Sequence, residues 1–288
     1  MPERAQTAAD DAPRAGRCAI VGRPNVGKST LLNALLGQKL AIATTKPGTT
    51  RSCVLGVYSA TEPPTQIAFV DTPGLHRPKS ALGRVLQEQA ELGLADADVV
   101  VFMTEVPPKP KKGAPPGPAL DAGDTAILDL VARSGRPVVL AVNKVDSLRD
   151  KSRLLPFLTA LNESHPFTST VPISAREGTQ LPVLLEEIRK HLPEGVLYDD
   201  PDYLTDRPER FFVAELIREA AMQQTREEVP HGVAVVIDRF VDDEGRAFID
   251  ATLVVEKPSH KGIVIGAHGQ RIKSIGVDAR REIETFLG

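Results

Sequence analysis

The sequence is poor in cysteine and aromatic residues, and it lacks any long uninterrupted apolar run. Its 288 residues include only two cysteines, Cys18 and Cys53, and no tryptophan. Two cysteines cannot form the disulfide framework of a small secreted domain, so we expect packed thiols in a reducing, cytoplasmic compartment. No stretch approaches the roughly 20 apolar residues that a membrane-spanning helix requires. Residues 1–16 are polar, have no apolar signal core and are predicted to form a disordered leader.

An excess of charge of either sign is also lacking, because 35 Lys/Arg nearly balance 38 Asp/Glu and leave a net charge of −3. Its distribution is uneven: Lys257 to Arg281 contains six Lys/Arg and a single acid, Asp278. An anionic partner is therefore expected at this end of the chain. A peripheral contact with an acidic membrane surface stays open, although no amphipathic anchor is evident. We expect a monomer.

Apolar runs alternate with segments of helical periodicity over residues 17–192, which predicts an α/β domain with a mostly parallel sheet. The apolar runs at 52–60 and 67–71 are separated by too few residues for a crossover helix, so this pair of strands is expected to be antiparallel. The expected strands are 18–22, 52–60, 67–71, 98–104, 137–143 and 170–174. The expected helices are 28–37, 80–95, 123–134, 150–163 and 181–191.

Two segments lack periodicity, and a second domain follows them. Residues 106–123 are rich in Pro, Gly and Lys and are predicted to be a surface loop of the first domain. Residues 193–210 are predicted to be an interdomain linker. The remainder, 211–288, is expected to be a small α+β domain. Its predicted elements are a helix at 211–227, strands at 232–240 and 247–256, and helices at 259–267 and 270–287.

The first apolar run leads into GRPNVGKST, residues 22–30, which matches G-x-x-x-x-G-K-[ST] between a strand and an amphipathic helix. In this pattern Gly22 and Gly27 let backbone N–H groups point at phosphate oxygens at a helix N-terminus. Lys28 is expected to bridge the β- and γ-phosphates, and the Ser29 hydroxyl to ligate Mg²⁺. The other predicted nucleotide contacts here are Asn25, Val26 and Thr30.

DTPG, residues 71–74, lies at the end of another predicted strand and is expected to contact Mg²⁺ and the γ-phosphate. Asp71 is expected to hold Mg²⁺ through water. The Gly74 N–H is expected to meet the γ-phosphate, so that the following segment is ordered only in the triphosphate state. Thr72 and Pro73 are the other nucleotide contacts predicted in this motif.

The segment TTKPGTTR, residues 44–51, lies between these two motifs and must supply a threonine to Mg²⁺ and the γ-phosphate. We choose Thr50, with Thr49 as the alternative. The competing interpretation is an ordinary turn that leads into a strand, since Pro, Gly and Thr are common in turns.

NKVD, residues 143–146, follows a buried strand and predicts selection for guanine. The Asp146 carboxylate can accept from the N1–H and N2–H₂ groups of guanine, and a buried carboxylate left unpaired by another base discriminates by factors on the order of 10⁴. Asn143 is expected to brace the loop and the Lys144 stem to cover the ring. The SAR segment supplies Ser174 and Ala175, whose N–H is expected to meet guanine O6.

Together, GRPNVGKST, PGTTR, DTPGLHRPK, NKVD and SAR resemble the bacterial Era GTPases over nearly the whole chain from Arg17. The resemblance implies hydrolysis of GTP with Mg²⁺. Leu75 stands where Ras-type enzymes place a glutamine, so another catalytic strategy is required. The resemblance implies that Asn25 helps to bind K⁺, and a loop-shaping role is the alternative. The expected catalytic set is Lys28, Thr50, Asn25 and Gly74.

Near the C-terminal end, Gly266-Ala267-His268-Gly269 joins two predicted helices within the basic stretch. A GXXG loop allows the backbone to clamp about four nucleotides, as in KH domains. The order of elements resembles a type II KH domain that lacks its last strand. Aromatic residues make up only 4% of the chain, which argues against an RRM-type stacking surface. The predicted RNA contacts are this loop together with Lys257, Lys261, Arg271 and Lys273.

The same resemblance implies a ribosome-assembly factor whose KH domain binds the 3′ end of small-subunit ribosomal RNA, with the 30S subunit as partner. The alternative is an RNA-binding chaperone in which GTP hydrolysis only times release. Five isoleucine and valine side chains are expected to supply both the core of the KH domain and the floor of an apolar groove for bases, with a role in the core alone as the alternative: Ile263, Val264, Ile265, Ile272 and Ile275.

Overall fold

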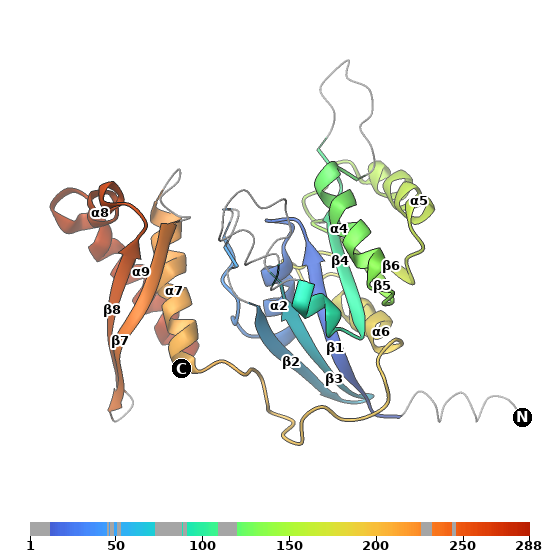
Figure 1. Cartoon of the computed structure of the whole chain (residues 1–288), viewed down its shortest axis with the longest axis horizontal. Helices are drawn as coiled ribbons and strands as arrows, with labels where there is room; N and C mark the ends of the chain where they lie inside the picture. Colours follow the sequence, from blue (N-terminus) through green and yellow to red (C-terminus); the bar gives the residue numbers. More distant parts are fainter. Residues whose placement is uncertain are drawn as a thin grey trace, which may run out of the picture. The chain divides into compact units, whose positions relative to one another are not determined.

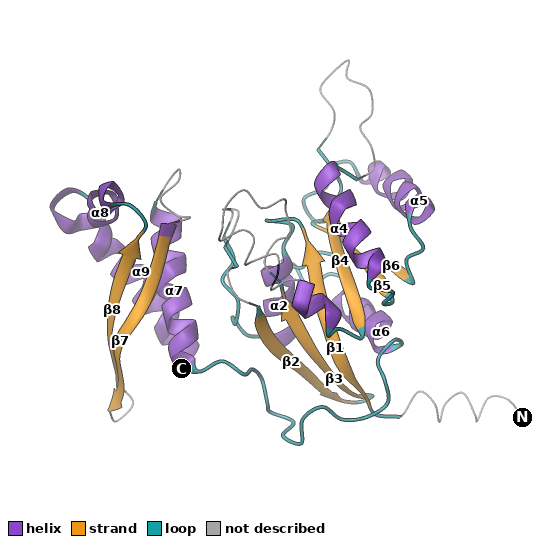
Figure 2. Cartoon of the chain, in the orientation of Figure 1, coloured by secondary structure: helices purple, strands orange, loops and turns teal. Residues whose placement is uncertain are grey.

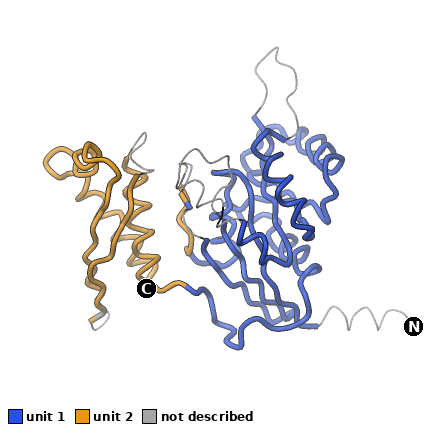
Figure 3. Tube along the Cα trace, in the orientation of Figure 1, with its two compact units in different colours: residues 1–38, 50–206 blue, residues 39–49, 207–288 orange. Residues whose placement is uncertain are grey.

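The computed structural model describes residues 12–44, 46, 49–50, 53–72, 88, 91–108, 120–225, 232–243 and 246–288. The chain divides into two compact units (Figure 3). The first comprises Met1–Gln38 and Thr50–Asp206, and the second comprises Lys39–Thr49 and Arg207–Gly288. Among the described residues, no helix is both long enough and apolar enough to cross a bilayer.

The first unit is built around a mixed six-stranded sheet with the order β2-β3-β1-β4-β5-β6 (Figure 1). As predicted, all neighbouring pairs are parallel except β2 and β3, which are antiparallel. The strands are β1 (Arg14–Gly22), β2 (Val54–Thr61), β3 (Pro64–Asp71), β4 (Val99–Glu105), β5 (Val138–Asn143) and β6 (Ser169–Pro172). β4 and β5 are apolar and buried almost throughout, as is typical of parallel strands covered on both faces.

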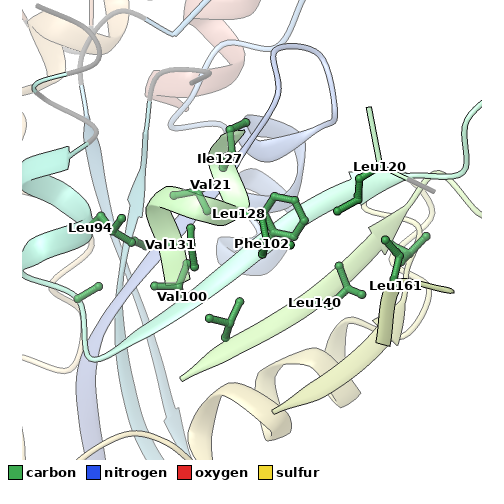
Figure 4. Close-up of a cluster of buried hydrophobic side chains, with 14 of the residues drawn as sticks. Val21, Leu94, Val100, Phe102, Leu120, Ile127, Leu128, Val131, Leu140 and Leu161 are labelled. Carbon is green, nitrogen blue, oxygen red and sulfur yellow. The ribbon is translucent and has the colours of Figure 1, made fainter. Parts of the chain in front are cut away.

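Helices cover this sheet (Figure 2). Those with both ends among the described residues are α2 (Lys28–Leu36), α4 (Ala122–Arg133), α5 (Leu154–Ser164), which follows a short 3-10 turn η1 (Lys151–Arg153), and α6 (Leu181–Arg189). Asp121 caps α4 by accepting from the N–H groups of Gly123 and Asp124. On one face, Phe102 of β4 lies beside Leu128 of α4, and Leu140 of β5 and Leu161 of α5 belong to the same buried cluster (Figure 4).

Two boundaries differ from the sequence prediction. β1 begins at Arg14, so the last three residues of the expected leader pair with β3 in the sheet. The expected linker is also anchored: the Ala15 N–H donates to Pro193 O (3.0 Å) and the Val57 N–H to Leu204 O (2.8 Å). Periodicity missed both features because backbone hydrogen bonds hold these segments, and such bonds require no repeating apolar pattern. Most of the helix expected at 80–95 and of the loop expected at 106–123 lies outside the described residues.

The second unit contains a two-stranded antiparallel sheet covered by helices. Its elements are α7 (Glu209–Gln224), β7 (Val233–Asp243), β8 (Arg246–Val255), α8 (Pro258–Ile265), the 3-10 turn η3 (Ala267–Gly269) and α9 (Gln270–Leu287). Leu216, Val264, Ile275 and Ile283 are among the residues that form its core. The predicted order of helix, two strands and two helices is therefore correct.

Candidate functional site

The segment Gly22–Thr30 connects β1 to α2 at the carboxyl edge of the parallel strands (Figure 1). Close neighbours explain its two signature glycines. A Cβ on Gly22 would lie 2.5 Å from the backbone oxygen of Met103, and one on Gly27 would clash with the side-chain amide of Asn143. Gly27 also has φ +107, which side chains rarely adopt. The loop therefore wraps tightly against the ends of β4 and β5.

Lys28 is buried at the start of α2, with a residue exposure of 6%. Its Nζ donates to the carbonyl oxygens of Gly22 and Arg23, each 3.1 Å away. Burial lowers the pKa of the Lys28 ammonium, and the nearby Asp71 charge opposes this effect. The only positive charge at the start of α2 is therefore held inside the loop.

Three oxygen-bearing side chains converge beside Lys28. Ser29 Oγ donates to Asp71 Oδ2 at 2.7 Å and lies 3.0 Å from Thr50 Oγ1. The Thr50 hydroxyl is 3.5 Å from the same carboxylate oxygen. The alternative residue, Thr49, instead donates to the Lys46 carbonyl at 2.6 Å. The structure thus brings Thr50, and not Thr49, into this cluster.

The cluster fits a hard divalent cation such as Mg²⁺, which prefers oxygen ligands. Asp71 is fully buried, and its Oδ1 has no hydrogen-bond partner. Burial raises the pKa of the Asp71 carboxyl, while Lys28, Ser29 and Thr50 oppose the rise. Within the described ranges no group of three or more His, Cys, Asp or Glu side chains is arranged for a metal. A metal at Asp71 would consequently draw on hydroxyl, phosphate and water oxygens.

Asn143, at the end of β5, joins two loops. Its Nδ2 donates to the Val26 carbonyl at 2.8 Å, and its Oδ1 accepts from the Ala175 N–H at 2.9 Å. The predicted bracing role of Asn143 therefore has a direct structural basis. The Ala175 N–H, which we expected to meet guanine O6, is bonded to Asn143 in this structure.

Lys144 and Asp146 follow Asn143 on the same loop. Ser174 Oγ donates to Asp146 Oδ1 at 2.7 Å, and this bond lowers the pKa of the Asp146 carboxyl. Asp146 is exposed, which corrects the expectation of a buried carboxylate. Only a base lying over it would exclude water. Lys144 has φ +64 and donates to Asn25 O at 2.7 Å while pairing with Glu105 at 2.8 Å.

The remaining predicted nucleotide contacts differ in placement. Val26 is buried and Thr30 lies in the first turn of α2. Thr72 is also buried, but its hydroxyl donates to the Ile20 carbonyl at 2.8 Å and so ties β3 to β1. Pro73, Gly74 and Leu75 lie outside the described residues.

In the second unit, the GXXG segment forms a tight turn between α8 and α9. Gly266 and Gly269 have φ +74 and +75, and His268 between them has φ +50. The Arg271 guanidinium donates to the Ile263 carbonyl, so it ties the turn to α8 in addition to any role with phosphates. Two glycines thus sit where side chains are disfavoured, as a backbone clamp requires.

Lys257, Lys261 and Lys273 are all exposed on this unit, and His268 is exposed in the turn. The apolar residues around them divide into two groups. Val264 and Ile275 are buried in the core, whereas Ile263, Ile265 and Ile272 are exposed. A role in the core alone is therefore wrong for those three isoleucines, because α8 and the start of α9 present them to solvent.

Comparison with known proteins covers both units. Residues 17–144 match the family described as "50S ribosome-binding GTPase", and residues 228–288 match the family described as "KH domain". The chain is 43% identical over 280 residues to GTPase Era from Geobacter metallireducens, covering 96% of this chain and 90% of that protein. The chain belongs to the Era family of GTPases.

Two solved Era structures extend the match. One is Era in complex with MgGDPNP and nucleotides 1506–1542 of 16S ribosomal RNA, with a TM-score of 0.87 and 40% identity. The other is an Aquifex aeolicus Era variant bound to GDP and aluminium fluoride, with a TM-score of 0.85 and 40% identity. Each alignment covers 96% of this chain and 90% of the other. The predicted fold, a P-loop GTPase domain followed by a KH domain, is thereby confirmed.

This Era-family chain also contains site residues that the motifs did not indicate. Glu105, at the end of β4, pairs with Lys144. Arg23 carries two ion pairs with α4 from within the phosphate-binding segment. The sequence does show that Glu105 follows an apolar run and that Arg23 occupies an unspecified position of the phosphate-loop pattern. Neither observation identifies the partner residue, which becomes known only from the fold.

Proposed function

We propose that this Era-family GTPase binds GTP with Mg²⁺ at the carboxyl edge of the first sheet and hydrolyses it to GDP and phosphate. The observation that carries the proposal is the convergence of three clusters at one edge: buried Lys28, the Ser29–Thr50–Asp71 oxygens, and the braced NKVD loop. Ligands of open α/β sheets bind at this edge. The proposal assigns phosphate binding to the backbone of Gly22–Thr30 and to Lys28.

Ser29 and Thr50 would ligate Mg²⁺ directly, and Asp71 would act through water, with its partnerless Oδ1 as a further acceptor. When bound, Mg²⁺ neutralises charge on the phosphate oxygens. Lys28 would exchange its two carbonyl acceptors for phosphate oxygens, and their negative charge would favour the ammonium form. This chain's own residues thus supply fixed charges and donors rather than covalent chemistry.

We assign Gly74 to the γ-phosphate and Asn25 to K⁺, with loop shaping as the alternative for Asn25. Asn25 has φ +63, a left-handed conformation that asparagine adopts more readily than most residues, and this favours the loop-shaping role. With Leu75 in the sequence position of the Ras glutamine, a bound cation would supply positive charge near the transferring phosphoryl group. Turnover measured in K⁺ and in Na⁺ at equal ionic strength tests this assignment. Equal rates would remove the potassium site.

Base selection rests on Asp146, and its decisive test is Asp146→Asn. The amide can donate to the extra xanthine oxygen, so we expect the preference to switch from guanosine to xanthosine nucleotides. The expected change in relative affinity is about 100-fold or more, since each unpaired polar group costs about 1–3 kcal/mol. Competition between labelled GDP and each nucleotide measures it. An unchanged preference would contradict the base assignment.

We further propose that the KH domain binds small-subunit ribosomal RNA near its 3′ end, and that the 30S subunit is the assembly partner. Support comes from the solved Era complex with 16S ribosomal RNA and from the exposed lysines around the GXXG turn. The family description that names the 50S particle matches residues of the GTPase domain alone. With such partners, the protein would act in the cytoplasm as a monomer.

The alternative function is an RNA chaperone in which hydrolysis only times dissociation. Single-turnover GTP hydrolysis with and without the 16S fragment separates the two functions. An assembly factor that responds to its RNA should hydrolyse GTP faster when the fragment is present. A rate that the RNA leaves unchanged would favour the timer.

A further inference from the structure

Arg23, the second residue of the phosphate-binding segment, reaches from the loop to the first turn of α4. Its Nη1 pairs with Asp121, and its Nε lies 3.0 Å from Asp124 Oδ1. The Nε contact is not aligned as a hydrogen bond, so its attraction is mainly electrostatic. Arg23 thus sits between two carboxylates of one helix end.

The two carboxylates are themselves held in place. Asp121 accepts from the Gly123 and Asp124 N–H groups, and Asp124 accepts from Thr104 Oγ1 of β4 at 3.0 Å. Asp124 is 2% exposed, and burial raises the pKa of its carboxyl while Arg23 opposes the rise. A Cβ on Gly123 would lie 3.2 Å from Arg23 Cδ, which shows that the arginine stem packs on α4.

The backbone of the same arginine contacts the phosphate-binding lysine, because Lys28 Nζ donates to the Arg23 carbonyl at 3.1 Å. We propose that Arg23, Asp121, Asp124 and Thr104 form a brace that positions the phosphate loop, and with it Lys28, for nucleotide. We call this group the Arg23 brace. Arg23 acts through the loop backbone and is a positioning residue, since its side chain is directed to α4.

This inference rests on the proposed assignment of Gly22–Thr30 to the phosphates. Arg23→Met removes the positive end of the brace and keeps most of the stem. We expect GDP to dissociate about tenfold faster, because small displacements of a positioned group have effects of this size or larger. Arg23→Lys keeps the charge without the fork that serves two carboxylates and should give an intermediate rate.

Arg23→Met also leaves Asp124 as a buried charge without its cation, so the variant should lose thermal stability. The double variant Arg23→Met with Asp124→Asn separates stability from positioning. Its neutral amide still accepts from Thr104, so the midpoint of thermal unfolding should recover while GDP dissociation stays fast. A purely structural ion pair would instead recover both properties together.

The experiment follows displacement of a fluorescent GDP from the full chain by excess GDP, alongside thermal unfolding. Arg17→Met is the matched control, because it removes an exposed pair with Asp96, 3.4 Å apart, in the same unit. It should dissociate GDP like the wild type. Dissociation from Arg23→Met within twofold of the wild type, or full recovery in the double variant, would overturn the brace. Failure of the wild type to bind GDP, or equal binding by Lys28→Ala, would instead overturn the phosphate-loop assignment.

Discussion

The nucleotide site of the first unit consists of side chains that hold one another, whereas the proposed RNA surface of the second consists largely of side chains that face solvent. Ser29, Asp71 and Asn143 each have close partners within the protein. Lys261 and Lys273 are exposed. The first arrangement favours one ligand in one geometry, and the second favours a flexible polyanion held mainly through charge. Single substitutions in each unit test this difference.

Lys28→Met should have the largest effect. It removes a buried ammonium from the phosphate loop, and charged hydrogen bonds contribute about 1.5–3 kcal/mol each, so two lost phosphate contacts predict at least ~100-fold weaker GDP binding. Titration with fluorescent GDP measures the loss, and unfolding checks the fold. Lys151→Met, at an exposed lysine of the same unit, is the control. An effect below tenfold would mean that Lys28 is not the main phosphate contact.

The next test compares two glycines of the second unit. Both have left-handed φ, but a Cβ on Gly266 would lie 2.7 Å from Arg271 Cβ, whereas one on Gly269 would meet nothing within 4 Å. Gly269→Ala should cost about 1–2 kcal/mol of unfolding free energy through backbone strain alone. Gly266→Ala should cost about 1–3 kcal/mol more, because its Cβ is crowded and because its ψ of 174° lies outside the left-handed helical region that Gly269 occupies. Urea unfolding of both variants measures the difference, and equal losses would contradict it.

The sequence predicted features that depend on local backbone geometry better than features that depend on tertiary contacts. The spacing of GRPNVGKST, DTPG and NKVD encodes backbone geometry at strand ends, so the sheet and the set of strand-end loops were predictable. Thr50, and not Thr49, lies beside Ser29, while its contact with Mg²⁺ and the γ-phosphate stays a prediction. Local patterns do not report tertiary contacts, however. They therefore missed Arg14 in β1, the exposure of Ile263 and the pairing of Arg23 with α4.

Substitution of the exposed lysines tests the proposed RNA surface of the second unit. Lys261→Gln and Lys273→Gln should each weaken binding of the 16S fragment by about three- to tenfold. Each should reduce the slope of log affinity against log salt by about 0.7, the value for one phosphate contact on a single strand. GDP affinity should not change. Lys151→Gln controls for net charge, and an unaltered salt slope in both variants would remove these lysines from the RNA surface.

Glu105→Gln should have the smallest effect. It tests whether the ion pair between Glu105 and Lys144 contributes to nucleotide binding. Glu105 pairs with Lys144 at 2.8 Å, but the two side chains remain 34% and 38% exposed. Solvent screens such a pair, and exposed pairs contribute about 0.2–1 kcal/mol. Lys144 also keeps its bond to Asn25 O at 2.7 Å, which does not depend on Glu105. We therefore expect GDP dissociation to accelerate by no more than about fivefold, with a larger change at low salt than at high salt. A change as large as that of Lys28→Met would show that Glu105 determines the position of Lys144. The bond from Lys144 to Asn25 O would then be insufficient to hold the NKVD loop in place.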